Sequence, residues 1–302
     1  MKVFVTGATG YLGSAIACRL VKAGLRVHGL ARSAARSESL GSIGVTPVLG
    51  SLEQPESYLA DLKNCDAVVH VARASSDPII IDQKVLEAIR IGALDGRVRH
   101  VLYTSGAHVH GPASDEPQDE TATLTPAPTV IWRPAHEEVA LDLVEHDVHV
   151  SVMRPGKVYG GHGGYFGGWF REGVQRKTVS YPGDGDQHWH LVHREDVAEA
   201  YRLALEHARG GQKFLLLDGS RHPARELAEA AARATGAETR SIPREQVLEQ
   251  LGDVGAALLM DQRLSAAKAR RELGWVPRHA SFITEAEALY REWMDGRRAT
   301  VS

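Results

Sequence analysis

Glycines at positions 7, 10 and 13 constrain the fold of this chain more than any other feature of its sequence. They follow an apolar run at residues 3–5, which predicts a buried strand, and they precede apolar residues at every fourth position from 12 to 20, which predict a helix. In such a unit, Gly7 permits a tight turn, Gly10 lets a pyrophosphate approach the backbone, and Gly13 lets the helix pack close to the sheet. The helix N-terminus offers free N–H groups to phosphate. The segment is therefore predicted to bind a dinucleotide.

Short apolar runs alternate with helical patterns along the rest of the first two thirds of the chain. The further strands expected are residues 27–30, 45–49, 67–71, 101–104, 148–153 and 213–217. Apolar strands that alternate with helices predict a parallel sheet with helices on both faces. The glycine turn and this alternation together predict an α/β protein with a Rossmann-type, doubly wound parallel sheet.

The end of the second strand distinguishes the two nicotinamide cofactors. An NAD site usually has an acidic residue there, which binds the ribose 2′-hydroxyl. Here the strand ends in Arg32 and Ser33, with Arg36 nearby and no acidic residue before Glu38. A guanidinium forms charge-assisted hydrogen bonds to a 2′-phosphate, so the pattern favours NADP(H) as cofactor. The alternative is that Arg32 is a solvated loop residue.

The composition is that of an ordinary globular protein, with 43% hydrophobic and 24% charged residues over 302 positions. The net charge of −3 gives no reason to expect nucleic acid or an acidic membrane as partner. No apolar run is long enough to span a membrane and no signal-peptide pattern precedes the first strand, so we expect a cytoplasmic protein. Cys18 and Cys65 predict neither a disulfide framework nor a metal site.

Several motifs in a fixed order make the chain resemble the extended short-chain dehydrogenase/reductase family, which is related to sugar-nucleotide epimerases and dehydratases. The motifs are TGATGYLG at residues 6–13, VVHVA at 68–72, YTS at 103–105, RPGKVYG at 154–160, VHREDVA at 192–198 and ELGWVP at 272–277. The resemblance implies a Rossmann domain over residues 1–160, to which 191–218 return, and a small substrate domain over 161–190 and 219–302. It also implies a cleft active site for a small molecule and a homodimer.

The resemblance extends to the nucleotide-binding residues. Those expected to contact the cofactor are Gly7, Thr9, Gly10, Tyr11, Leu12, Gly13, Arg32, Ser33, Arg36, Ser51, Leu52, Val71, Ala72, Arg73, Thr104, Ser105, His136, Pro155, Gly156 and Val158.

The proton chemistry of the family, in contrast, does not carry over. The family uses a Tyr-x-x-x-Lys pair, but here Trp132 stands at the Tyr position and His136 at the Lys position. The chain therefore resembles an atypical member. Hydride transfer still requires a proton donor or acceptor near the reacting atom. The candidates for this catalytic role are Ser105, His108, His110, His136 and Tyr159.

Residues 162–170 combine glycines with four aromatic side chains, and they are interpreted either as a lid over the substrate or as a packed part of the small domain. We expect an NADP(H)-dependent oxidoreductase that acts on a small carbonyl or imine compound. Two alternatives stay open. One is an epimerase, dehydratase or cyclase that retains its cofactor, and the other is a non-catalytic NADP-binding sensor, since a fold does not determine a function.

Overall fold

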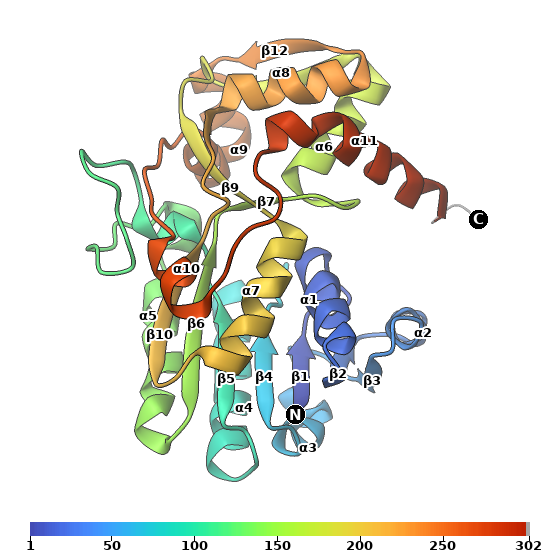
Figure 1. Ribbon diagram of the computed structural model, residues 1–302, viewed down its shortest axis with the longest axis vertical. Helices are drawn as coiled ribbons and strands as arrows, with labels where there is room; N and C mark the ends of the chain where they lie inside the picture. The colour runs from blue at the N-terminus through green and yellow to red at the C-terminus, as the bar shows by residue number, and fades with distance from the viewer. Residues whose placement is uncertain (300–302) are drawn as a thin grey trace.

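A seven-stranded, fully parallel sheet forms the larger part of the computed structural model, which describes residues 1–299 (Figure 1). The strands are β1 (Lys2–Thr6), β2 (Arg26–Ala31), β3 (Thr46–Leu49), β4 (Ala67–His70), β5 (His100–Thr104), β6 (His149–Pro155) and β10 (Gly211–Leu216). Their order across the sheet is β10-β6-β5-β4-β1-β2-β3. The order reverses between β1 and β4, which is where dinucleotides bind in doubly wound folds. The predicted fold class is confirmed.

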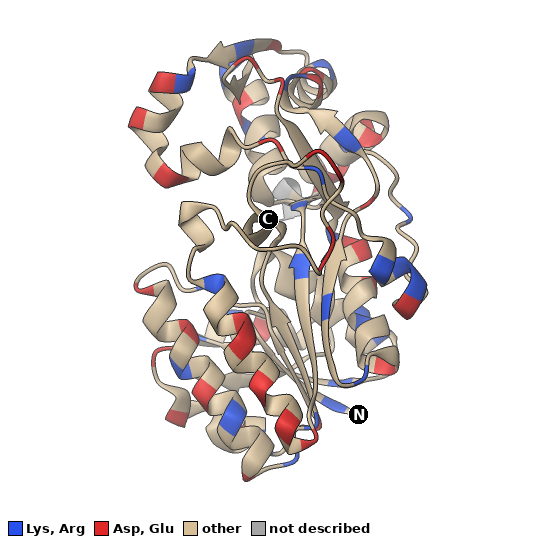
Figure 2. Cartoon of the chain, turned by 90° about the vertical axis from the view of Figure 1, so that its left-hand side faces the viewer, with Lys and Arg blue, Asp and Glu red and all other residues tan. Residues whose placement is uncertain are grey.

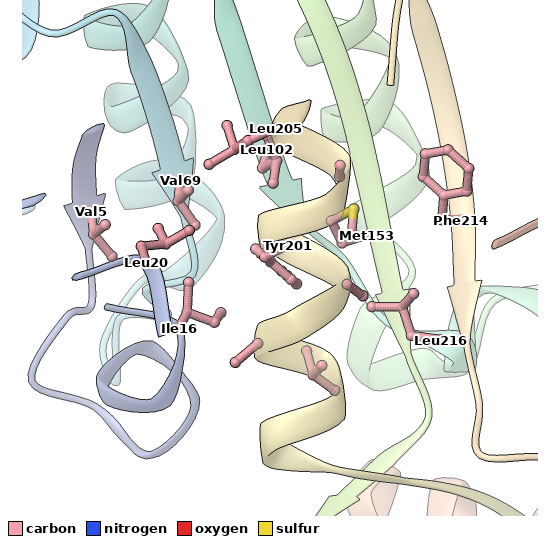
Figure 3. Close-up of a cluster of buried hydrophobic side chains, with 14 of the residues drawn as sticks. Val5, Ile16, Leu20, Val69, Leu102, Met153, Tyr201, Leu205, Phe214 and Leu216 are labelled. Carbon is pink, nitrogen blue, oxygen red and sulfur yellow. The ribbon is translucent and has the colours of Figure 1, made fainter. Parts of the chain in front are cut away.

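Helices cover both faces of this sheet. One face carries α1 (Tyr11–Lys22), α2 (Ala34–Gly41), α7 (Arg194–His207) and α10 (Ala267–Leu273), and the other carries α3 (Leu59–Lys63), α4 (Pro78–Leu94) and α5 (Arg133–Leu141). On the first face, Tyr201 and Leu205 of α7 lie in one buried cluster with Leu102 of β5 and Met153 of β6 (Figure 3). The burial of both sheet faces explains why the strands are apolar throughout rather than alternating.

A smaller part lies beyond the carboxyl ends of the strands, at the top of Figure 1. It contains α6 (Gly164–Arg176), α8 (Ala224–Thr235), α9 (Arg244–Leu258) and α11 (Phe282–Ala299). Its strands form two small sheets: β7 (Lys157–Tyr159), β9 (His188–His193) and β11 (Arg221–Pro223) in one, and β8 (Thr178–Pro182) and β12 (Glu238–Ile242) in the other. The chain passes between the two parts several times, since α7, β10 and α10 all return to the larger sheet.

The aromatic segment at residues 162–170 belongs to the core of the smaller part. Phe166, Trp169 and Phe170 of α6 are almost completely buried, and they pack in one cluster with Phe282 and Trp189. Of the two interpretations of this segment, the structure therefore supports packed core rather than a lid.

Charged residues are distributed over the surface with both signs interspersed (Figure 2). Among the described residues, no helix is long and apolar enough to cross a membrane.

Candidate functional site

The turn after β1 has the geometry that its glycines predict. Gly7 has a φ of +71°, which favours glycine, and a Cβ there would lie 2.8 Å from the Cα of Ala72. A Cβ on Gly13 would collide with the Gly7 carbonyl oxygen. That oxygen also accepts a 2.8 Å hydrogen bond from the Gly10 N–H. There is no space for a side chain at positions 7 and 13. The backbone of this turn is therefore not covered by side chains on the side where a ligand would approach.

Helix α1 begins directly after this turn. Gly10 is its N-cap, no side chain caps the helix, and its first turn contains no acidic residue. The first N–H groups are therefore free to bind an anion, and the helix dipole adds a favourable potential. Tyr11 connects the turn to the smaller part of the molecule, because its hydroxyl donates a 2.7 Å hydrogen bond to the Gly160 carbonyl.

Arg32 lies at the carboxyl end of β2 and is exposed, as are Ser33 and Arg36. Ser33 caps α2, since its Oγ accepts a 3.4 Å hydrogen bond from the Arg36 N–H. The Arg32 guanidinium forms no hydrogen bond or ion pair to any described residue, so it is free to bind a ligand. Glu53 is the acidic group close to it: a hydrogen bond from Ser51 lowers the pKa of Glu53, and the charge of Arg32 adds to this effect.

The remaining cofactor candidates lie around the same edge of the sheet. Ala72 lies against Gly7, and Thr104 is hydrogen-bonded through its hydroxyl to Tyr201 at 2.7 Å. Leu12, Val71 and Val158 pack against the core on the α1 side, and Leu52 packs against the core on the other side. Thr9 is partly exposed in the glycine turn.

A cavity of about 370 Å³ lies beyond the carboxyl ends of β4, β5 and β6. Four segments of the larger part contribute to it. They are the loop after β4 (Arg73), the loop after β5 (residues 105–108), the chain that leads into α5 (Thr129, Val130 and Arg133) and the corner between β6 and β7 (residues 155–157). The opposite wall is apolar and comes from α9 of the smaller part, with Val254, Ala257 and Leu258. The cavity is thus a cleft between the two parts, at the position where the nicotinamide half of a dinucleotide lies in this fold.

Two basic side chains meet inside this cavity. The Lys157 Nζ lies 3.3 Å from the His108 Nε2, and it lies 4.6 Å from the centroid of the Trp189 ring. Burial lowers the pKa of Lys157 to about 7. Burial, and then the charge of Lys157, lower the pKa of His108 to about 3. At neutral pH the imidazole is therefore neutral and accepts a hydrogen bond from the ammonium group.

Ser105 contributes a hydroxyl group to the same cavity. Its N–H donates to the Met153 carbonyl at 2.8 Å, which fixes its backbone, but its buried Oγ has no hydrogen-bond partner among the described residues. An unpaired buried hydroxyl is costly unless a ligand satisfies it. Arg73 and Arg133 also line the cavity, and no carboxylate does. The lining is therefore positively charged on one side and apolar on the other.

Arg133 is held in place by a buried network centred on Asp82 of α4. The carboxylate lies 2.8 Å from the His136 Nδ1, 3.0 Å from the His70 Nε2 and 2.7 Å from the Tyr103 hydroxyl. Arg133 in turn donates to the Tyr103 hydroxyl at 2.8 Å and to the Thr104 carbonyl at 3.1 Å. Burial opposes ionisation, but the hydrogen bonds from His136 and His70 and the charge of Arg133 hold the pKa of Asp82 well below its usual range.

Trp132 and His136 are the residues predicted to stand at the family's Tyr and Lys positions. His136 is 4% exposed and binds Asp82, and it does not line the cavity between the two parts. Trp132 packs its ring against the Arg133 guanidinium at 4.1 Å and lines a separate hollow between α4 and α5. Arg133, one residue further along, is the side chain that reaches the cavity.

Two other candidates for proton transfer lie away from the cavity. The His110 Nε2 lies 3.1 Å from Arg154, which is itself paired with the buried Glu137, so His110 belongs to the interior. Tyr159 is fully buried in the aromatic core of the smaller part. Of the five catalytic candidates, the structure thus brings Ser105 and His108 together in one cavity and places His110, His136 and Tyr159 elsewhere.

Lys157, Arg133 and Asp82 were not among the site residues that the sequence predicts. Lys157 lies two residues beyond the carboxyl end of a buried strand, between Gly156 and Val158, with no acidic residue nearby in the sequence. A lysine at that edge of a parallel sheet is a signal that sequence reasoning can use. Asp82 offered only a weak signal, because it follows three isoleucines in a helical stretch that also contains other charged residues.

One group of side chains has the composition of a metal site, although the sequence predicts none. Ligand atoms of His193, Glu195 and His279 lie within 4.8 Å of one another. The two imidazole rings, however, are stacked with their centroids 3.6 Å apart. Nitrogen lone pairs lie in the plane of each ring, so stacked rings do not direct them at a common ion. His279 is also engaged with Glu285 at 2.6 Å.

The strand order, the glycine turn and the cleft at the strand ends define a Rossmann-type α/β protein with a cleft between its two parts. The sequence model of the NAD dependent epimerase/dehydratase family matches residues 3–216. The chain therefore belongs to this family, which confirms the predicted resemblance.

Individual relatives have several activities. A Schizosaccharomyces pombe protein described as uncharacterized is 30% identical over 292 residues, which cover 94% of this chain and 98% of that protein. The 4-hydroxy-2-methyl-3-oxo-4-farnesyl-3,4-dihydroquinoline-1-oxide ketoreductase of Stigmatella aurantiaca is 26% identical over 309 residues, with 92% of each chain covered. The crystal structure of a dTDP-glucose 4,6-dehydratase from Streptomyces venezuelae with NAD bound has a TM-score of 0.84 at 21% identity, covering 99% of this chain and 98% of that one.

Proposed function

We propose that this protein is an NADP(H)-dependent oxidoreductase that reduces a carbonyl or imine group of a small molecule. The observation that carries the proposal is the cavity beyond the carboxyl ends of β4, β5 and β6, where the unpaired Ser105 hydroxyl and the Lys157–His108 pair face the apolar wall of α9. The nicotinamide cofactor supplies the hydride when it is bound. The polar side chains bind and protonate the substrate oxygen or nitrogen, and the apolar wall holds the rest of the substrate away from water.

The preference for NADP(H) rests on the end of β2. Arg32 is exposed, and none of the described carboxylates pairs with it, whereas the residue that would bind the 2′-hydroxyl of NAD is absent from this strand end. The ribose 2′-phosphate would bind the Arg32 guanidinium, while the Ser33 hydroxyl and the N–H groups at the start of α2 provide further donors.

A reduction is favoured over the chemistry of a sugar nucleotide by the composition of the cavity. Val254, Ala257 and Leu258 give it an apolar wall, which suits an apolar ketone better than a hydroxylated sugar. The ketoreductase from Stigmatella aurantiaca acts, by its name, on a ketone with an apolar chain, and it aligns with almost the whole of this protein. An epimerase or dehydratase that retains its cofactor is the second candidate, because the family model and the structural similarity to a dTDP-glucose dehydratase include that chemistry.

The test is a reductase assay on the purified protein. NADPH consumption is followed by absorbance with a panel of aliphatic and aromatic ketones, aldehydes and cyclic imines, and cofactor binding is measured separately by calorimetry. We expect turnover of apolar ketones or imines, and none with Gly13→Val, which blocks the glycine turn. Tight binding of NADPH without turnover of any compound would instead favour the sensor, and a cofactor that survives purification would favour the epimerase or dehydratase.

We also propose that the protein forms a homodimer, as the family resemblance implies, and that α4 and α5 form its interface. Ile79 and Ile80 of α4 and Val139 of α5 are 42%, 56% and 50% exposed, and they lie on the side of these helices that faces away from the sheet. A second copy of the chain would cover this apolar surface.

A further inference from the structure

We propose that Lys157 is the proton donor of this protein, taking the place of the tyrosine that the rest of the family uses. The proposal rests on the proposed reductase function and names the group that delivers the proton to the substrate oxygen or nitrogen. Lys157 lies at the corner where β6 ends and β7 begins, and it is held there because β7 pairs with β9 in parallel, with Lys157 opposite Leu191. Its side chain enters the cavity from the carboxyl edge of the sheet.

The elements packed around Lys157 present imidazole, guanidinium and aromatic side chains to its amino group. The loop after β5 presents His108, the first turn of α5 presents Arg133, and the loop after β4 presents Arg73. Strand β9 presents the ring of Trp189, and the neighbouring His188 is already paired with Asp261 at 3.0 Å. Among the described residues, no acid forms an ion pair with Lys157. Burial favours the neutral amine over the ammonium, and no carboxylate among these neighbours offsets that effect, although the Trp189 ring stabilises the ammonium form through its face.

The other polar groups of the cavity are poorer proton donors. The two arginines stay protonated at any accessible pH, so they can bind but not release a proton. Ser105 has no base within hydrogen-bond distance that could activate its hydroxyl. His108 is neutral, because burial and Lys157 lower its pKa to about 3. Lys157, with a pKa of about 7, is the group that both holds and releases a proton near neutral pH.

The step is balanced within the proposed reaction. As the carbonyl carbon accepts the hydride from NADPH, its π electron pair moves to oxygen. An N–H bond of the Lys157 ammonium breaks, and its proton forms the O–H bond of the alcohol, or the N–H bond of the amine when the substrate is an imine. Lys157 is left as a neutral amine, and water returns the proton after the product leaves. His108 acts as a positioning residue, since its Nε2 accepts one ammonium hydrogen and directs the others.

The experiment compares Lys157→Met and Lys157→Arg with the wild-type protein, using the ketone or imine of the panel that is reduced fastest. Lys84→Met is the matched control, because Lys84 is an exposed lysine on α4. We expect Lys157→Met to lower kcat by about 10²- to 10⁴-fold, the usual contribution of general acid catalysis, with KM and the Kd of NADPH nearly unchanged. Lys157→Arg keeps a positive charge but provides no group that releases a proton near neutral pH, so it should not restore kcat. Lys84→Met should behave as wild type.

Two further measurements separate proton donation from simple charge. The wild-type kcat should fall as the pH rises through about 7, because the acid form of Lys157 is lost, and this decrease should be absent in Lys157→Met. In the cofactor-free protein, NMR of ¹³C-methylated lysines should show one resonance, missing in Lys157→Met, that titrates far below the ordinary lysine range. A midpoint in the ordinary range, or a Lys157→Met variant that keeps its kcat, would overturn the proposal.

A higher KM at unchanged kcat in Lys157→Met would also overturn it, since it would show that Lys157 only binds an anionic substrate. A wild-type protein that reduces no compound refutes the proposed function and this inference together. A wild-type protein that is active beside an equally active Lys157→Met refutes only the assignment of the donor.

Discussion

Replacing Asp82 tests whether the network beneath the cavity has the energetic role that its geometry implies. The carboxylate accepts hydrogen bonds from four groups: the His70, His136 and Tyr103 side chains and the Arg133 guanidinium, the last at 3.4 Å. Asp82→Ala removes this acceptor from all four buried donors, and one of them, the Arg133 guanidinium, carries a permanent charge. Removal of one partner from a buried ion pair costs about 3–5 kcal/mol. A loss of this size corresponds to a decrease in Tm of roughly 5–8 °C in a chain of this length.

The assay is thermal unfolding of wild type, Asp82→Ala and a matched exposed variant, Asp95→Ala. The Asp95 side chain is 65% exposed and its carboxylate lies 3.9 Å from the Lys63 Nζ, so its loss should change stability by no more than about 0.5 kcal/mol. Tyr103→Phe removes a single hydroxyl from the same network and should cost about 1 kcal/mol. If Asp82→Ala were as stable as Asp95→Ala, the network would not hold Arg133. The Asp82 network would then not explain why Arg133 of α5 extends to the cavity.

Three further predictions concern the cofactor site and the surface of α5. Arg32→Ala should weaken binding of NADPH by about 10- to 100-fold in calorimetry, the loss expected for hydrogen bonds to a charged group, and leave binding of NADH nearly unchanged; equal losses for both cofactors would contradict the role of Arg32. Gly13→Ala should weaken both cofactors by about tenfold or more, because its methyl group collides with the Gly7 carbonyl oxygen. Val139→Asp should give a monomer in light scattering, whereas Leu251→Asp, an equally exposed leucine on α9, should leave the dimer intact.

The fold could be predicted from the sequence because its signals are local. An apolar strand, a glycine turn and a helix with regular apolar spacing fix the first unit, and the same alternation repeats along the sheet. The smaller part was harder to predict. The segment from Leu264 to Trp275 lies in the sequence range expected for the small domain, yet it packs in the core of the larger part through Ala269 and Leu273. Only the three-dimensional path of the chain reveals that return.

The candidate site could be predicted only in part, because the direction of a side chain after a strand is not a local property. Ser105 and His108 line the cavity. His110 lies only two residues after His108, but its side chain is buried in the interior, where it contacts Arg154. No signal in the sequence distinguishes a histidine that lines the cavity from one that is buried in the interior. The same holds for His136, whose partner Asp82 lies 54 residues earlier in the chain.

The predicted loss of the Tyr-x-x-x-Lys pair and the role proposed for Lys157 fit together physically. The start of α5 takes part in the Asp82 network, in which His136 has the predicted position of the family's lysine and Arg133 extends to the cavity. A guanidinium at that place repels a second cation and cannot give up a proton. The proposed proton donor therefore comes from another edge of the cavity. The corner after β6 supplies Lys157, whose burial favours the release of its proton.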